Sequence, residues 1–190
     1  SLDPSFSTTS SILMGNLAGT ELAVGWDRSR TLLQSELSGF ETYGTNAQPL
    51  AFITSPVFDN GRVIGVLAMG IGPERIWKML SDLSGLGDTG EIVTGQRVGE
   101  NVLVTIPLRF NLDSAFKFKI PIGAGMGSAT QKAASGNRGY GNSTDYRGES
   151  VIAAWCYLPS YRWGMNVKQD ASEAFAMMNF QRNVILGISL

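Results

Sequence analysis

The chain has 190 residues, with 15 Lys or Arg, 16 Asp or Glu, one Cys and no His, so its net charge is −1. An apolar fraction of 43% excludes a disordered chain, because so much apolar surface needs a buried core. The lack of His excludes His-based general bases, Ser-His-Asp triads and the usual zinc sites, and no basic run is present for binding nucleic acid.

The first half of the chain predicts a helix, a β-hairpin and a second helix. Apolar residues recur at helical spacing before Gly39, which is expected to end the first helix. The Asn60-Gly61 pair predicts a tight hairpin turn, and the strand after it is apolar enough that both of its faces should be covered. The expected helices cover residues 12–37 and 73–84, and the expected strands cover residues 49–58 and 62–70.

The second half predicts an antiparallel sheet of short strands. The expected strands cover residues 91–94, 101–108, 116–120, 150–158 and 162–168, with a short helix over 129–135 and a loop over 136–142. Asp170 and Glu173 have the spacing of a capping box, which predicts a final helix. Short strands joined by tight turns, with helices at the ends and on one face, predict an α+β fold with a central antiparallel sheet of PAS-like type.

Motifs that carry chemistry are sparse. The glycine cluster at residues 123–128 lacks the Lys-Ser/Thr pair of a phosphate loop. The sequence has no paired carboxylates at catalytic spacing, and it has no base that could activate a Ser or Thr hydroxyl. We therefore expect no catalytic residue, no metal and no cofactor. The sequence DYRG at residues 145–148 predicts either a hairpin turn or a loop that faces a ligand.

Three stretches resemble the extracytoplasmic Cache sensor domains of bacterial and archaeal receptors. The first is FETY at 40–43 with PLAFITSPVFD at 49–59 and GVLA at 65–68. The second is GLGDTGE at 85–91. The third is DYRG at 145–148 with VIAAW at 151–155, WGMNVK at 163–168 and DASEAF at 170–175. Their order and spacing carry the resemblance, which is to the double Cache type.

The resemblance implies a reduced or incomplete membrane-distal module over residues 1–84, a membrane-proximal module over 85–170, and an exit helix over 171–190. The exit helix would continue from Val184 into a membrane segment. A cytoplasmic histidine kinase, cyclase or chemotaxis output domain would follow it outside this chain. The implied location is extracytoplasmic, and the implied partner is a small molecule such as an amino acid, a carboxylate or an amine, with a homodimer as the assembly.

We expect the ligand in one of two pockets. The candidates for a distal pocket are Trp26, Arg30, Tyr43 and Phe52. The candidates for a proximal pocket are Arg109, Tyr140, Asp145, Tyr146 and Trp155. The alternative hypothesis is a dimerisation or partner-binding module without a small ligand, and a His-independent enzyme is the least favoured one.

Overall fold

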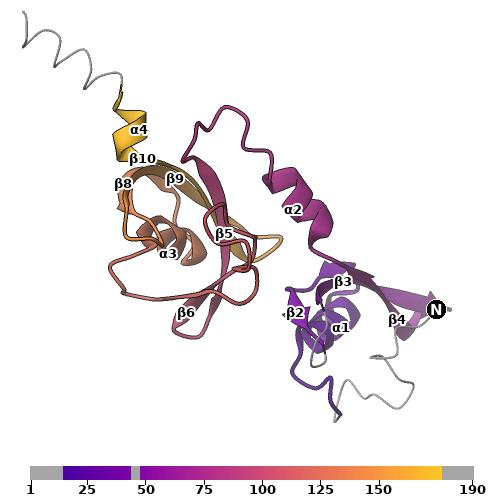
Figure 1. Cartoon of the computed structure of the whole chain (residues 1–190). Helices are drawn as coiled ribbons and strands as arrows, with labels where there is room; N and C mark the ends of the chain where they lie inside the picture. The colour runs from indigo at the N-terminus through magenta and orange to yellow at the C-terminus, as the bar shows by residue number, and fades with distance from the viewer. Residues whose placement is uncertain (1–14, 44–47, 177–190) are drawn as a thin grey trace, which may run out of the picture. The chain divides into compact units, whose positions relative to one another are not determined.

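The computed structural model describes residues 15–43 and 48–176, which form two compact units that divide between Ile76 and Trp77 (Figure 1). Both units combine antiparallel strands with short helices, which confirms the predicted α+β class. Residues 12–14 of the first predicted helix and the apolar end of the chain from Val184 lie outside the described residues.

Unit 1 is a helix packed on a small antiparallel sheet. Its elements are α1 (Glu21–Leu32), β1 (Glu36–Leu37), β2 (Glu41–Thr42), β3 (Pro49–Asp59) and β4 (Arg62–Ile71). Strand β3 pairs with β4 along its length, and the chain reverses at Asn60 and Gly61, whose φ angles of 46° and 77° confirm the predicted hairpin turn. The core gathers Leu17, Leu22, Tyr43 and Phe52.

The first helix is shorter than the helical spacing predicted. It begins after Thr20, whose hydroxyl accepts the Ala23 N–H, and it ends at Leu33, which adopts a left-handed φ of 57°. The prediction of helix to residue 37 with a cap at Gly39 is wrong. Glu36 and Leu37 instead pair with β3, because the backbone hydrogen bonds of a sheet outweigh a weak local helical preference.

The prediction that both faces of the second hairpin strand are covered is also wrong for the described residues. Helix α1 packs on one face of the hairpin that β3 and β4 form, where the hydroxyl of Thr54 on β3 donates to the Gly25 carbonyl at 2.9 Å. The large side chains of β4 remain open to solvent, since Ile64, Leu67 and Met69 are 66%, 67% and 58% exposed.

Helix α2 (Glu74–Leu80) contains the boundary between the two units. Its second part belongs to unit 2, because the Trp77 indole N–H donates to the Thr105 carbonyl at 2.8 Å. The helix ends at Leu80, before the predicted end at residue 84, and its Met79 side chain is exposed.

Unit 2 is a six-stranded antiparallel sheet in the order β7-β6-β5-β10-β9-β8. The strands are β5 (Glu91–Val98), β6 (Asn101–Val104), β7 (Lys119–Pro121), β8 (Gly139–Thr144), β9 (Ser150–Leu158) and β10 (Trp163–Asp170). Helix α3 (Ser128–Ala134) lies against one face of the sheet, and α4 (Ala171–Ala174) leaves the end of β10 (Figure 1). Gly164 permits the close approach of α3, since a Cβ there would lie 2.2 Å from the Ala134 nitrogen.

Several predictions for unit 2 need correction. The expected strand over 116–120 begins only at Lys119, because Phe116 adopts a left-handed φ of 57° in a turn. The expected loop over 136–142 contains the first part of strand β8, which pairs with β9 despite its glycines because the backbone N–H and C=O groups on that edge of β9 need partners. The expected strand to residue 108 ends at Val104, after which Ser114 satisfies the backbone at Ile106 and Leu108. The expected capping box does not form, because Asp170 makes no side-chain cap bond and instead pairs with Arg147.

The core of unit 2 lies between the sheet, α3 and the end of α2. Its fully buried apolar side chains come mainly from β5, β6, β7 and the segment after β6, and they are Val93, Val102, Val104, Ile106, Leu108 and Ile120. Across residues 15–43 and 48–176, no helix is both long enough and apolar enough to cross a membrane.

Candidate functional site

A buried ionic cluster occupies the centre of unit 2. Antiparallel register places Lys168 of β10 directly opposite Glu91 of β5, and Asp145 follows β8. The Lys168 ammonium lies 2.7 Å from an Asp145 carboxylate oxygen and 3.2 Å from a Glu91 carboxylate oxygen, and all three side chains are 1% exposed. Charges this deeply buried persist only when they are paired, so each of these groups depends on the others.

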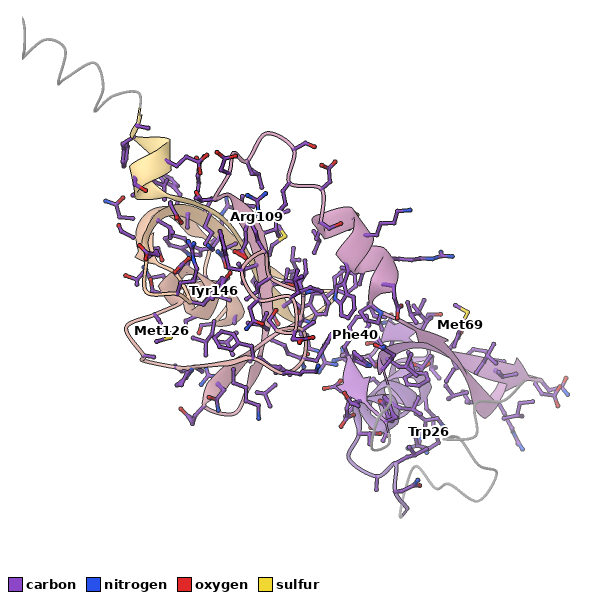
Figure 2. The ribbon with its side chains drawn as sticks, in the orientation of Figure 1. Trp26, Phe40, Met69, Arg109, Met126 and Tyr146 are labelled. Carbon is purple, nitrogen blue, oxygen red and sulfur yellow. The ribbon has the colours of Figure 1, made fainter. Side chains whose placement is uncertain are left out.

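Tyr146 and Asp145 are held inside this cluster. The Tyr146 hydroxyl donates to both oxygens of Glu91 at 2.9 and 3.0 Å, and burial is the main cause that raises the pKa of Tyr146. Tyr146 is labelled in Figure 2. Burial alone would raise the pKa of Asp145, but hydrogen bonds from Lys168 and Arg147 outweigh it and lower the pKa.

Asp145 also closes the turn that follows β8. Its carboxylate accepts the backbone N–H groups of Arg147 and Glu149 at 2.8 and 3.0 Å. This geometry supports the hairpin-turn interpretation of residues 145–148, in which Asp accepts local backbone hydrogen bonds. Arg147 extends the cluster, because its guanidinium bonds Asp145 at 2.7 Å, reaches Asp170, and stacks 4.2 Å from the Phe110 ring centroid.

The space between this cluster and α3 has no room for a ligand. It is lined by Asp145, Tyr146, Lys168, Asn166 and Thr130 among others, and its free volume is about 0 Å³. The Thr130 hydroxyl donates to Asn166 at 2.8 Å, which ties α3 to β10 across the same space. Asp145 and Tyr146 are therefore occupied by contacts within the protein.

An open groove lies at the start of the edge strand β8. It has a volume of about 600 Å³, within the range of about 300–1,000 Å³ that small-molecule sites have. Its lining consists of aromatic, small and cationic residues and contains no acid: Gly136, Arg138, Gly139, Tyr140, Ala154, Trp155, Cys156, Tyr157 and Pro159. A neighbouring cavity of about 290 Å³ shares Tyr140 and Ala154 with it.

The charge of this groove is positive. The Lys132 ammonium lies 4.8 Å from the Trp155 ring centroid, and within residues 15–43 and 48–176 no acidic side chain pairs with Arg138. Tyr140 is 87% exposed, and the Trp155 indole nitrogen is buried with no hydrogen-bond partner in the described part of the chain. The exposed donors of the groove are therefore the Tyr140 hydroxyl and the Arg138 guanidinium, which suit an acceptor-rich molecule.

The five proximal candidates are separated by the structure. Tyr140 and Trp155 line the groove, whereas Asp145 and Tyr146 lie in the ionic cluster. Arg109 bonds the loop before β5, because its guanidinium donates to the Gly87 carbonyl at 3.1 Å and to the Asp88 carbonyl. Its backbone N–H donates to Glu91.

The four distal candidates form two pairs in unit 1. The exposed Arg30 side chain stacks on the Trp26 ring, which is labelled in Figure 2, at 4.8 Å and also pairs with Asp27 at 3.1 Å. Tyr43 and Phe52 are buried in the core with their ring centroids 5.3 Å apart. The Tyr43 hydroxyl accepts the Leu22 N–H at 2.9 Å, and burial is the main cause that raises the pKa of Tyr43.

Sequence reasoning did not single out Glu91, Lys168 or Arg138. Glu91 and Lys168 could have been found from the sequence, because each is a charged residue in a largely apolar strand, and a charge that such a strand buries needs a partner. Arg138 had no such signal, because its place beside the aromatic residues depends on the pairing of β8 with β9. Among the described residues, no group of three or more Cys, Asp or Glu side chains is arranged to hold a metal ion.

The fold is that of Cache-type sensory domains. No family model and no curated protein matches the sequence. Solved structures do match, at low sequence identity. The ligand-binding domain of Mlp24 with asparagine has 14% identity and a TM-score of 0.57, over 81% of this chain and 58% of that one. The corresponding domain of the Pseudomonas aeruginosa PAO1 amino acid chemoreceptor PctB, with L-Arg, has 16% identity and a TM-score of 0.52, over 80% and 61%.

The extracellular domain of mmHK1S-Z3, a protein named as a histidine kinase, has 15% identity and a TM-score of 0.59, over 81% of this chain and 55% of that one. The chain therefore spans less than two thirds of each of these structures. These neighbours are sensory domains of chemoreceptors and histidine kinases, which confirms the fold that the Cache resemblance implied.

Proposed function

We propose that this chain is the extracytoplasmic sensing part of a membrane receptor and that it binds a small molecule. The observation that carries the proposal is the shared fold, since sensory domains with the same architecture bind asparagine in Mlp24 and L-Arg in PctB. On this proposal the domain performs no catalysis, and α4 carries the ligand state toward a following membrane segment and a cytoplasmic output domain.

We place the ligand in the groove at the start of β8. Tyr140 and Trp155 would contact its apolar part, and Arg138 would hold a carboxylate through paired N–H donors. Because the groove lining contains no acid, carboxylates and amino acids should bind better than amines. The other candidate place is unit 1, where Arg30 stacks on Trp26.

Thermal shift and calorimetric titration of the 190-residue chain with amino acids, carboxylates and amines test this proposal. A ligand at a hundredfold excess over its Kd adds about 2.7 kcal/mol to the free energy of unfolding. Arg138→Gln should weaken binding at least about tenfold, whereas the exposed Arg97→Gln, on β5, is the matched control. Loss of binding in Arg30→Gln alone would move the site to unit 1, and no binding across the panel would contradict the ligand proposal.

A second candidate function is self-association without a ligand. Strand β4 favours it, because residues 63–71 contain neither a charge nor a proline and, within the described chain, β4 pairs only with β3. An exposed apolar edge of this kind can pair with the same edge of a second copy. Light scattering after size exclusion tests it: a dimer that Leu67→Lys converts to a monomer supports it, and a monomeric wild-type chain contradicts it.

A further inference from the structure

The short helix α4 is attached to the loop before β5 through one carboxylate. Glu173 accepts the backbone N–H groups of Asp88 and Thr89, each at 2.8 Å, and also the Thr89 hydroxyl. The same Thr89 oxygen accepts the Asp170 N–H at 3.0 Å, so Thr89 bonds both the start of α4 and its acidic residue. We call Glu173 together with residues 87–89 the α4 latch.

Apolar packing does not fix α4. Within the described residues, none of the side chains of α4 (Ala171–Ala174) is buried. Hydrogen bonds from the Thr89 hydroxyl, then from the Asp88 and Thr89 backbone, lower the pKa of Glu173 to about 2. The carboxylate is therefore charged at neutral pH, when these hydrogen bonds are at full strength.

The latch is continuous with the buried ionic cluster on both of its sides. On the loop side, Arg109 bonds the carbonyls of Gly87 and Asp88 and donates its backbone N–H to Glu91. On the helix side, Asp170 pairs with Arg147, which in turn pairs with Asp145. A ring of polar contacts thus runs from the loop through the cluster to α4 and back to the loop.

We propose that the α4 latch is a conformational switch. It opens and closes as one unit with the ion pairs that Arg147 makes to Asp145 and Asp170, while the sheet stays intact. Partly exposed hydrogen bonds open at a lower free energy than buried strands, so the latch can open without unfolding β5 or β10. This inference rests on the proposed function, in which α4 carries the signal. It adds the contact at which α4 is held or released.

Hydrogen exchange of the unliganded 190-residue chain tests the latch. Glu173→Gln removes the charge, Thr89→Val removes the hydroxyl, and Glu100→Gln is the control at an exposed acid in the same unit. We expect exchange over residues 86–90 and 170–176 to become about tenfold faster in the first two variants. Rates in β5 and β10 and in the Glu100→Gln control should not change.

Two results would overturn the latch as a local switch. One is unchanged exchange in both latch variants, and the other is an acceleration that extends equally through β5 and β10, which would show general destabilisation. The link to the cluster is tested by the double variant Arg147→Gln with Glu173→Gln. If the latch and the Arg147 ion pairs open together, exchange in the double variant should accelerate by less than the product of the two single accelerations. An acceleration equal to that product would refute the link. Because no ligand is used, these outcomes are independent of the titrations that test ligand binding.

Discussion

Lys168→Met tests the account of the buried cluster most directly. The ammonium lies 2.7 and 3.2 Å from two carboxylates that are each 1% exposed, and methionine has a similar length without the charge. Removing one partner of a buried ion pair costs about 3–5 kcal/mol, because the remaining charges are left without compensation. We expect a loss of that size in the free energy of unfolding of unit 2 at pH 7.

The loss should depend on pH with a defined sign. In the wild-type chain the pKa of Asp145 is lowered on folding, so this carboxylate stabilises the fold above its ordinary pKa, and that contribution disappears as the pH falls through the lowered pKa. In Lys168→Met the hydrogen bonds from Arg147 and from the turn backbone remain, so the pKa of Asp145 should be lowered less on folding than in the wild type. The difference in the free energy of unfolding between variant and wild type should therefore shrink as the pH falls below the ordinary pKa of an Asp carboxyl, about 3.9.

Urea unfolding at several pH values measures both effects. The control is Lys117→Met, which removes an exposed ion pair of 4.0 Å and should cost less than about 1 kcal/mol. A loss below about 1 kcal/mol for Lys168→Met at pH 7, or a loss that stays the same as the pH falls from 7 to about 3, would refute the reasoning.

Three further predictions concern packing and exposure. Gly164→Ala should lower the free energy of unfolding by about 2 kcal/mol or more, because the added Cβ would lie 2.2 Å from the Ala134 nitrogen. Gly65→Ala, which has open space around it, is the control and should not destabilise. Equal melting temperatures of the two variants in thermal unfolding would contradict the close packing of α3. Tyr146→Phe should cost about 1.5–3 kcal/mol by urea unfolding, since its hydroxyl donates to the buried Glu91 carboxylate; an unchanged midpoint would show that this hydrogen bond contributes nothing net. Leu67→Lys should change the free energy of unfolding by less than about 0.5 kcal/mol, because the side chain is 67% exposed; a larger loss would mean that this face is covered in solution.

Local chemistry was enough to predict several elements. Asn60 and Gly61 tolerate positive φ, so they mark the hairpin wherever the rest of the chain lies. The apolar strand at residues 150–158 was likewise predicted with the bounds that the structure has. The end of the first helix was not predictable in this way, because Glu36 and Leu37 belong to a strand only through their pairing with β3.

The candidate site shows the same division. The residue types of a ligand groove, Tyr140 and Trp155, were chosen from the sequence, but their separation from Asp145 and Tyr146 was not visible there. Asp145 could be interpreted as a turn residue or as a ligand contact, and which of the two applies depends on Lys168 lying 2.7 Å away.

By itself, the sequence determined the α+β class, the turns and the exclusion of His-based chemistry, because these follow from residue type and from contacts between near neighbours. Only the tertiary structure decided which charges are buried together and which aromatic residues face an open groove. The register between β5 and β10 sets Glu91 opposite Lys168, and neighbours so far apart in the chain are brought together by strand pairing and core packing, which no local pattern encodes.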